Sequence, residues 1–366
     1  MVKKLHTLMK KNLLTIVLLA AAPGLAYAIG EPLGLFPALV DWNTIVTLSG
    51  LMLVTTGIKE SGLFYLLAYR IACRIGDKRL LALFLILMAA LLSMFLTNDI
   101  ALFIVVPLTL ALQQIVEDNL TKLIIFETIS VNVGSSLTPI GNPQNIYLWH
   151  QWGLSFPFFV KEMAPLVLIM AIFLLAMSLL CFPSEKIEVS SNHNDQVDHG
   201  LFIVSAILLV IFIVSVELGY ERYALPVIIL VVLITRRGVV LRTDWGLILL
   251  FIAIFVDIGL ISKVKGVNHL LAALDLRNPR TLFVCGALFS QVISNVPCAI
   301  LLAQHSTNFK MIAYGVAIGG NGLLIASFAN LIALRFSRSK RKYLCFHAYS
   351  IPFFLVTLIS AYYLLT

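Results

Sequence analysis

The stretch "FLTNDIALFIVVPL", residues 95–108, places an amide and a carboxylate side by side within a long apolar run. Thr97, Asn98 and Asp99 supply a hydroxyl, an amide oxygen and a carboxylate, and hard cations prefer such oxygen ligands. A carboxyl group in lipid is costly and usually faces a cavity or a proton path. Because removal from water disfavours the charged form of a carboxyl group, Asp99 could exchange a proton near neutral pH. We therefore expect ion binding and proton coupling at this stretch.

A second polar pair, Ser294 and Asn295, interrupts the apolar run 282–303 and precedes Val296 and Pro297. Both polar stretches resemble helix starts, because Asn, Asp and Ser cap the first amides of a helix and proline suits its first turn. Helix capping alone would explain them. A helix broken within the membrane, however, directs its N terminus and free carbonyls at a site, so both interpretations predict the same geometry. We favour a binding role.

Small and polar residues gather around Pro139 and Pro143, and a weaker counterpart follows in the second half of the chain. Proline removes backbone donors and glycine permits unwinding, so carbonyl oxygens become available as ligands for a hard cation. Close helix packing through small residues is the alternative. The predicted site residues are Asn132, Gly134, Ser135, Thr138, Gly141, Asn142 and Asn145 in the first cluster, and Gly319, Gly320, Asn321 and Asn330 in the second.

Two further acids lie deep in apolar segments. Asp257 is a second candidate for proton coupling, and the alternative is an ion pair with Lys263 or Lys265 nearby. Glu127 fits either a structural or a functional role.

The composition indicates the class of protein that carries these residues. Of the 366 residues, 60% are hydrophobic and 12% are charged, whereas a soluble domain is about half apolar and about a quarter charged. Charge-free runs of about twenty residues recur along the chain, which is typical of transmembrane helices rather than of a barrel. The net charge of +8 fits an excess of Lys and Arg in cytoplasmic loops, so nucleic acid is not an expected partner. The sequence predicts an all-α polytopic membrane protein.

The apolar runs predict the membrane spans. The first, 12–29, follows a basic N terminus, and a cleaved signal peptide ending near residue 28 is the alternative. The other predicted spans are 41–58, 123–148, 165–182, 201–217, 223–235, 244–261, 311–334 and 345–365. The polar stretch 184–200 is expected to be a solvated loop, and "RFSRSKRK", 335–342, a cytoplasmic anchor.

The run 80–112 is too long for a single span. Its 33 residues would form a helix of about 50 Å, whereas the hydrocarbon core is about 30 Å thick. A re-entrant hairpin with its tip at residues 97–99 fits, because irregular backbone is tolerated at that depth where it is buried or lines a cavity. The run 281–304 could be a hairpin or a full span.

Two hairpins give nine spans and place "RRGVVLR", 236–242, in the cytoplasm, whereas two full spans give eleven and place it outside. The positive-inside rule accepts both arrangements. We predict nine spans and two hairpins, because the two halves are then inverted, as transporters commonly show.

The two halves contain, in the same order, an Asp-Trp pair, an apolar span, a polar tip and a segment rich in glycine or asparagine. Segments 133–146 and 318–331 align without gaps, and the identical pairs are Gly134/Gly319 and Asn145/Asn330. Internal repeats with interrupted apolar segments are typical of secondary transporters. The predicted domains are a first half, 1–182, with the hairpin 80–112 and the broken helix 123–148; a polar linker, 183–199; and a second half, 200–366, with the hairpin 281–304 and the broken helix 311–334.

Signatures of other functions are missing from the sequence. The seven histidines lack metal-ligand spacing on a helix, and no nucleophile and base are recognisable. A GxxxxGK[ST] loop is absent, so ATP-driven pumping is not expected. Five cysteines without CxxC spacing indicate buried thiols, among which Cys298 lies near Asn295 in case the substrate is thiophilic. We expect neither an enzyme nor a cofactor; a channel, or a receptor or enzyme on the same fold, is the alternative.

These motifs resemble those of the ion transporter superfamily, which includes arsenite permeases, Na+/H+ antiporters of the NhaD type, citrate transporters and divalent-anion/sodium symporters. "TND" with Pro107 eight residues after Asp99, "TPIGNPQN" and "SNVP" followed by "GGN" carry the resemblance, from about residue 40 to the end. "LTNDIALFIVVPL" and "LTPIGNPQNI" are most similar to YbiR-type bacterial inner-membrane transporters. The resemblance implies two re-entrant hairpins and a bacterial cytoplasmic membrane. It implies cation or substrate positions at Asn98, Gly134, Asn145, Asn295 and Asn330.

Departures from the family pattern bear on the substrate. The dicarboxylate branch carries Ser-Asn-Thr at both tips, which hold sodium and the substrate carboxylates, whereas Asp99 and Val296 occupy the third position here. An ionised Asp99 would repel a carboxylate and Val296 lacks the hydroxyl, so the tips are more similar to the arsenite-permease branch.

We therefore expect a secondary transporter that moves a small ion, metalloid or oxyanion species by alternating access, coupled to protons or Na+. A citrate-like carboxylate symporter is the alternative, and a homodimer in the bilayer is compatible with the sequence. The expected Na+ ligands are Asn98, Asn145, Asn295 and Asn330.

Overall fold

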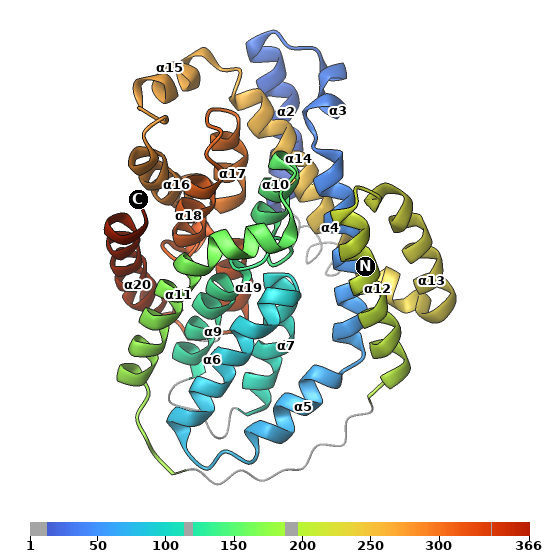
Figure 1. Ribbon diagram of the computed structural model, residues 1–366, viewed down its shortest axis with the longest axis vertical. Coiled ribbons are helices and arrows are strands. Elements are labelled where there is room, and N and C mark those ends of the chain that lie inside the picture. The colour runs from blue at the N-terminus through green and yellow to red at the C-terminus, as the bar shows by residue number, and fades with distance from the viewer. Residues whose placement is uncertain (1–12, 113–119, 187–196, 338) are drawn as a thin grey trace.

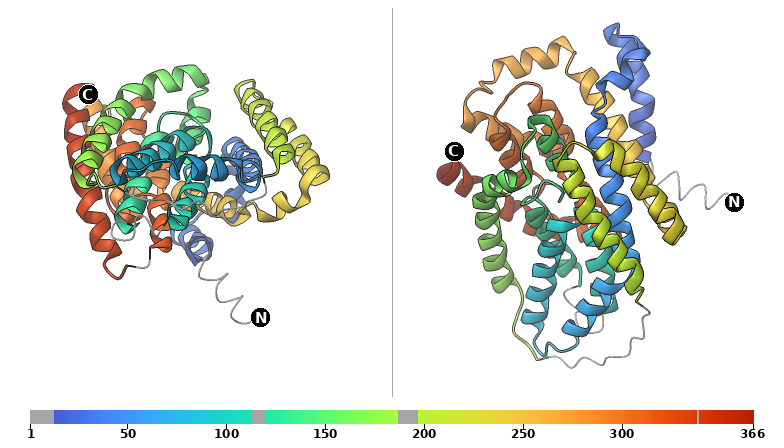
Figure 2. Two further views of the ribbon diagram at one scale, coloured as in Figure 1. Left: turned by 90° about the horizontal axis from the view of Figure 1, so that it is seen from below. Right: turned by 45° about the vertical axis from the view of Figure 1, so that its right-hand side comes forward.

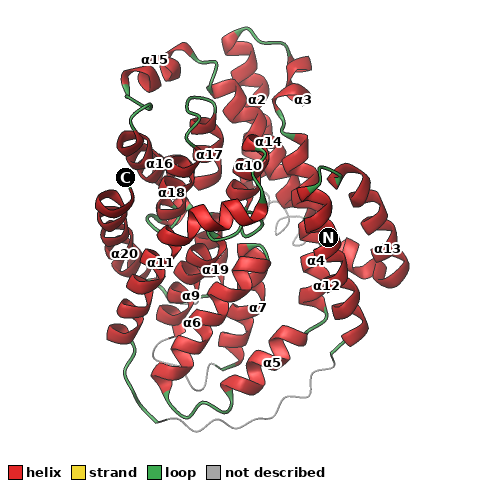
Figure 3. Cartoon of the chain, viewed as in Figure 1, coloured by secondary structure: helices red, strands yellow, loops and turns green. Residues whose placement is uncertain are grey.

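The computed structural model describes residues 13–112, 120–186, 197–337 and 339–366 (Figure 1). Within these ranges the secondary structure is helical, and the β contacts are limited to an isolated bridge between Asp77 and Lys186 (Figure 3). The basic N terminus and most of the predicted polar linker lie outside the described residues. The predicted all-α membrane architecture is confirmed.

The helices follow the predicted order of apolar segments. The first half comprises α2 (Leu13–Ile29), η1 (Leu33–Leu35), α3 (Phe36–Leu39), α4 (Trp42–Glu60), α5 (Leu63–Ala72), α6 (Lys78–Phe95), α7 (Asn98–Ala111), α9 (Leu120–Ser135), α10 (Pro143–Trp152) and α11 (Phe156–Cys181). The second half comprises α12 (His199–Glu217), α13 (Glu221–Arg242), α14 (Trp245–Ile261), α15 (Lys265–Ala273), α16 (Pro279–Ile293), α17 (Asn295–Ala303), α18 (Phe309–Gly319), η3 (Leu324–Ala326), α19 (Phe328–Phe336) and α20 (Lys342–Leu365).

Among the described helices, five are long and apolar enough to cross a membrane by themselves: α6, α11, α12, α13 and α20. The number is eight if each of the bent pairs α2–α3, α4–α5 and α14–α15 counts as one span. The predicted spans 123–148 and 311–334 are each divided into two short helices, so neither reaches the required length. These segments are broken, as predicted from their glycine and proline content.

Some helix bounds differ from the predictions. α11 begins at Phe156 rather than at 165, because the Ser155 side chain accepts a hydrogen bond from the Phe158 amide and caps the helix. α13 continues beyond the predicted span 223–235 through the basic stretch 236–242, with non-helical backbone angles at Arg236. The short helices α5 and α15 were not predicted from the sequence.

Both polar tips lie between two antiparallel helices. α6 and α7 pack against each other and are separated by Leu96 and Thr97, while α16 and α17 pack against each other and are separated by Ser294. Ser294 has φ 72° and ψ 157°, a backbone conformation that strains any residue other than glycine. The run 281–304, which the sequence left open, therefore forms a hairpin.

The two hairpins enter the molecule from opposite ends. In Figure 1, α6 and α7 lie in the lower half and α16 and α17 in the upper half, and the right-hand view of Figure 2 agrees. Each hairpin also packs on the other half of the chain, α7 against α19 and α17 against α10. The inverted arrangement predicted for the two halves is supported by these directions.

The stretch 236–242 contacts the C-terminal end of α4 and the residue just before α12. Arg236 pairs with Asp198, just before α12, and Arg242 pairs with Glu60, at the end of α4. The Asp198 amide donates to the Ser61 carbonyl at 3.0 Å. These contacts agree with the nine-span arrangement, in which 236–242 is cytoplasmic.

α12 and α13 form the periphery of the molecule. In the most apolar 18 residues of each helix, only 22% of the residues of α12 and 17% of those of α13 are buried. The left-hand view of Figure 2 shows both helices set beside the main body. Their outward apolar side chains match a lipid environment. Most of the buried polar residues lie instead on the hairpins, on the broken helices and on α4, and α12 and α13 contribute Ser205 and Glu221.

Candidate functional site

The first hairpin tip is attached to the break between α9 and α10. The Asn98 amide donates to the Gly141 carbonyl at 2.9 Å, and the Thr138 hydroxyl donates to the Met94 carbonyl at 2.5 Å. The break is irregular because it contains Pro139 and Gly141, and Pro143 begins α10 directly after it. These bonds place the tip residues predicted from the sequence against the first predicted cluster.

The second hairpin is attached to the break between α18 and α19 in a related way. The Ser294 hydroxyl donates to the Ala326 carbonyl at 3.3 Å, and Ala326 aligns with Gly141 in the gapless match of the two halves. Gln291 donates to the Gly319 carbonyl at 2.8 Å and accepts from the Leu323 amide at 2.7 Å. Gln291 was missed by the sequence reasoning, and its only signal is an amide in an apolar run close to Ser294.

Two glycines allow each hairpin to approach its broken helix. A Cβ on Gly134 would collide with the Ala90 carbonyl oxygen, and a Cβ on Gly319 would lie 2.6 Å from the Ser290 Cβ and 3.0 Å from the Ala287 carbonyl oxygen. Ala90 and Ala287 precede the corresponding tip residues Thr97 and Ser294 by seven positions each. The identical glycines thus make equivalent contacts, which supports the predicted internal repeat.

The identical asparagines Asn145 and Asn330 also make equivalent bonds. The Asn145 amide nitrogen donates to the carbonyls of Ser135 and Thr138 at 3.2 and 3.0 Å. The Asn330 amide nitrogen donates to the aligned carbonyls of Gly320 and Leu323 at 2.9 and 3.3 Å. Each asparagine therefore closes the break that precedes it.

Asn132 connects the two halves of the chain. Its amide nitrogen donates to Asn330 Oδ1 at 2.9 Å and to the Gly320 carbonyl at 3.2 Å. Its Oδ1 accepts from the Ser327 hydroxyl at 3.2 Å. A predicted site residue of the first cluster is thus brought into the second cluster.

The Asn142 side chain caps α10 and bonds to the end of α9. Its Oδ1 accepts from the Asn145 amide at 2.9 Å and caps α10, and its amide nitrogen donates to the Ser135 carbonyl at 3.1 Å. Ser327, the aligned residue, makes no side-chain cap.

The capping expected from the polar residues at the tips is wrong. α7 begins at Asn98 and α17 at Asn295, so the N-cap residues are Thr97 and Ser294, and neither makes a side-chain cap bond. Asn98 Oδ1 accepts from the adjacent Asp99 amide at 2.9 Å. The hydroxyls of Thr97 and Ser294 are therefore not consumed by helix capping, whereas Asn98 Oδ1 is engaged by a first-turn amide of α7.

Several buried oxygens around the tips and breaks lack a hydrogen-bond partner among the described residues. They are Asp99 Oδ1, Gln144 Oε1, Asn145 Oδ1, Asn321 Oδ1 and both carboxylate oxygens of Asp257. A buried acceptor without a partner costs about 1–3 kcal/mol. All of these atoms accept hydrogen bonds or coordinate cations, and such a set fits a bound monovalent cation or a donor group of a ligand. Gln144 was not among the predicted site residues.

The environment of Asp257 excludes one of its two predicted roles. Lys263 lies 3.0 Å from Glu31 and pairs with it, and neither oxygen of Asp257 has a hydrogen-bond partner in the described part of the chain. The ion pair with Lys263 does not form. Asp257 lies on α14, which contacts α17 of the second hairpin.

Each hairpin makes one further buried side-chain contact. The Thr109 hydroxyl donates to the Glu127 carboxylate, linking α7 to α9. Cys298 lies inside the second hairpin, with its sulfur 3.5 Å from the Gly286 carbonyl. Its thiol is thus directed at the other arm of the hairpin, away from the break. In the described residues, no group of three His, Cys, Asp or Glu side chains could hold a metal ion.

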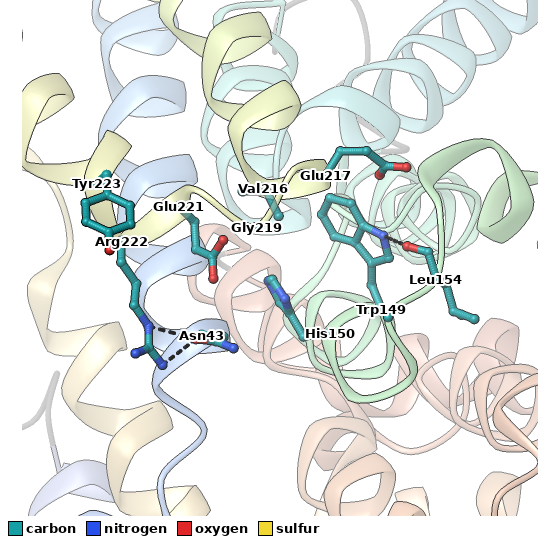
Figure 4. Close-up of a pocket in the computed structure, with 11 residues that line it drawn as sticks. Asn43, Trp149, His150, Leu154, Val216, Glu217, Gly219, Glu221, Arg222 and Tyr223 are labelled. Atoms are coloured by element: carbon teal, nitrogen blue, oxygen red, sulfur yellow. Dashed lines mark hydrogen bonds between the residues drawn. The ribbon is translucent and has the colours of Figure 1, made fainter.

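A separate cavity of about 460 Å³ lies at the C-terminal end of α10, away from Asn142 and Asn145. Figure 4 shows Glu221 and His150 directed toward one another, with Arg222 bound to Asn43 beside them. His150 also bonds the Thr47 hydroxyl at 2.8 Å and so links α10 to α4. None of the predicted site residues lines this cavity.

Comparison with known proteins gives the family. A family model described as "Citrate transporter" matches residues 7–309. "Inner membrane protein YbiR" of Escherichia coli (strain K12) is 42% identical over 331 residues, covering 90% of this chain and 89% of the relative. "Uncharacterized transporter MJ0456" of Methanocaldococcus jannaschii is 35% identical over 302 residues, covering 82% of each. The mouse "P protein" is 30% identical over 131 residues, which are 34% of this chain and 16% of the relative.

The family match extends over most of the described helices, from α2 to the start of α18. It includes both hairpins and the break that closes on the first tip. The chain is a membrane transporter of the citrate transporter family.

Proposed function

We propose that the chain is a secondary transporter of the bacterial inner membrane that moves a small ion, metalloid or oxyanion species by alternating access, coupled to protons or Na+. The observation that carries this proposal is a set of buried acceptor oxygens at the first tip and break, on Asp99, Gln144 and Asn145, that have no partner in the part of the chain the structure describes. The membrane assignment is supported by the name of the Escherichia coli relative, an inner membrane protein.

The same region is suited to a negatively charged or strongly polar substrate beside a cation. α7, α10, α17 and α19 all begin at a tip or a break, and helix N termini carry partial positive charge. The acceptor oxygens would hold the coupling cation or proton, and the N termini would face the oxygens of the substrate. Neither the predicted tip residues nor the predicted break residues include a Lys or Arg.

A carboxylate symporter is the second candidate, because the matching family model is described as a citrate transporter. Asp99 argues against it: its Oδ1 is buried and unpaired, and an ionised Asp99 would repel a substrate carboxylate at the tip. The third position of the second tip, Val296, offers no hydroxyl.

The test is ion-driven proton flux in proteoliposomes that contain an internal pH dye. The purified protein is challenged in turn with Na+, arsenite, citrate and sulfate, beside Asp99→Asn and the exposed control Asp275→Asn. We expect one solute to cause a pH change that is at least tenfold slower in Asp99→Asn and unchanged in Asp275→Asn.

The outcomes separate the candidates. A citrate-dependent pH change that persists in Asp99→Asn would support the carboxylate symporter and remove Asp99 from proton coupling. Failure of every solute to cause either a pH change or uptake of the labelled solute would contradict the proposed transport of these ions.

A further inference from the structure

We infer that the chain binds one coupling cation, at the break of the first half, because Asn132 fills the equivalent place in the second half with its own amide group. This inference rests on the proposed function and specifies its stoichiometry.

The two breaks begin as equivalent structures. Asn145 and Asn330 each donate their amide nitrogen to carbonyls seven and ten residues earlier in the chain. These donor bonds fix the orientation of both amide groups, since a flipped amide would place its oxygen against carbonyl oxygens. The Oδ1 atom of each asparagine must therefore face the other way.

What those Oδ1 atoms meet is different in the two halves. Asn330 Oδ1 accepts from the Asn132 amide nitrogen at 2.9 Å, whereas Asn145 Oδ1 is buried and has no partner among the described residues. A donor group and a cation compete for the same oxygen. The second break therefore has its acceptor satisfied by the protein itself, while the first keeps it for a ligand.

A single difference in sequence explains the difference in structure. One residue before the gapless alignment of the two halves, at the same offset, Asn132 corresponds to Ala317. Asn132 reaches from α9 to the start of α19, and the packing of α18 against α10 is the matching contact in the other direction. Ala317 is buried but has no amide to donate to Asn145.

The neighbouring position strengthens the asymmetry. Gln144 precedes Asn145, and its buried Oε1 also has no partner within the described ranges, whereas the aligned residue of the second half is Ala329. The first tip adds Asp99 Oδ1. Among the described residues, the second break itself keeps one unpaired oxygen, on Asn321; the other two unpaired oxygens beside the second hairpin are those of Asp257 on α14, outside both the break and the tip. A hard cation needs several oxygen ligands, and the first half provides them at its break and tip together.

The first part of the test counts bound cations directly. Equilibrium binding of radioactive Na+ is measured on the purified full chain in nanodiscs, with choline as the background cation. In a separate series, Li+ is added as a competitor and the displacement of Na+ is measured. We expect one saturable site per chain with a Hill coefficient of 1. Two sites per chain, or a Hill coefficient near 2, would overturn the inference.

The second part compares the two asparagines. Asn145→Ala should weaken Na+ binding at least tenfold, and Asn330→Ala should retain the wild-type affinity within about threefold. The opposite pattern would place the cation in the second half and would overturn the inference. Each variant is first checked for a monodisperse elution profile in choline buffer, because both asparagines hold a break closed.

The third part needs neither asparagine to be removed. Ala317→Asn supplies the first break with the amide that Asn132 gives to the second, so it should weaken Na+ binding at least tenfold. Ala317→Leu has similar bulk without a donor and serves as its matched control. Equal binding by the two variants would contradict the role assigned to the amide.

Failure of this inference is distinguishable from failure of the proposed function. If neither Na+ nor Li+ binds above the choline background, the cation site is rejected, while solute-dependent proton flux through Asp99 decides the transport proposal separately.

Discussion

The Asn132 side chain makes three hydrogen bonds, and all of them cross from the first half of the chain to the second. Its partners are a side-chain oxygen, a hydroxyl and a backbone carbonyl, so both ends of its amide are used. Such a buried and fully paired polar contact is costly to interrupt, because the groups left behind cannot reach water. Asn132 therefore links the two halves of the chain. Its amide also makes the two breaks different, because it occupies the acceptor oxygen of Asn330 and leaves that of Asn145 without a partner among the described residues.

Replacing Asn132 by alanine should lower the stability of the protein. The change leaves Asn330 Oδ1 and the Ser327 hydroxyl without their present partner, and each such buried group costs about 1–3 kcal/mol. We expect a total loss of about 2–4 kcal/mol in the free energy of unfolding, from denaturant unfolding in detergent. Asn268→Ala, at an exposed asparagine, is the control and should change it by less than about 0.5 kcal/mol. A loss as small as that of the control would show that the bonds between the halves contribute little.

The helices α6 and α9 lie close together because Gly134 has no side chain. A Cβ at this position would collide with the backbone carbonyl of Ala90, and a backbone atom cannot rotate away as a side chain can. The second half uses Gly319 against α16 in the same way. In each half, the glycine lets the hairpin lie close enough to the broken helix for its tip to bond the break. These tip bonds go to the carbonyls of Gly141 and Ala326.

Gly134→Ala should push the first hairpin away from its break. Overpacking of a close contact costs about 1–3 kcal/mol, and we also expect the transport rate to fall at least tenfold, since the tip moves with α6. The measurements are unfolding in detergent and flux in proteoliposomes. The control is Gly24→Ala, where no atom lies within 4 Å of the added Cβ; it should be neutral or stabilise by up to about 1 kcal/mol. Normal flux in Gly134→Ala would show that the close approach is dispensable.

The whole molecule has two chemically different ends. The ends of α4 and α13 and the start of α12 meet at one end through the pairs of Glu60 with Arg242 and of Asp198 with Arg236. The pair of Lys263 with Glu31 lies at the other end, where the segment after α2 meets the turn between α14 and α15 (Figure 1). The hairpins start from opposite ends, as alternating access to a central site requires.

The opposite entry of the hairpins predicts the sidedness of labelling by a membrane-impermeant maleimide. In a background with all five cysteines replaced by serine, Lys186→Cys and Arg74→Cys should react from the cytoplasmic side. Arg277→Cys, just before α16, should react from the other side. Intact cells and inside-out vesicles provide the comparison. Labelling of Lys186→Cys and Arg277→Cys from the same side would contradict the inverted arrangement.

Much of the fold could be predicted from the sequence because membrane helices obey local rules. Charge-free runs of sufficient length give helices, and glycine and proline mark the breaks at 136–142 and 320–327. The first hairpin followed from length alone. The second did not, because its run is short enough for one span and its turn depends on the left-handed backbone of Ser294, which is not a residue type that predicts such a conformation.

The sequence by itself determined the class of protein, the order of its helices and the residues at the tips and breaks, since each of these depends on composition or on neighbours in the chain. Only the tertiary structure decided which polar groups are paired. Asn132 and Asn330 are far apart in the sequence and bond at 2.9 Å, whereas Asn145, identical in type and local pattern to Asn330, keeps an unpaired oxygen. The physical reason is that a hydrogen bond depends on position in space, and residues on separate helices acquire their positions only when the two halves pack together.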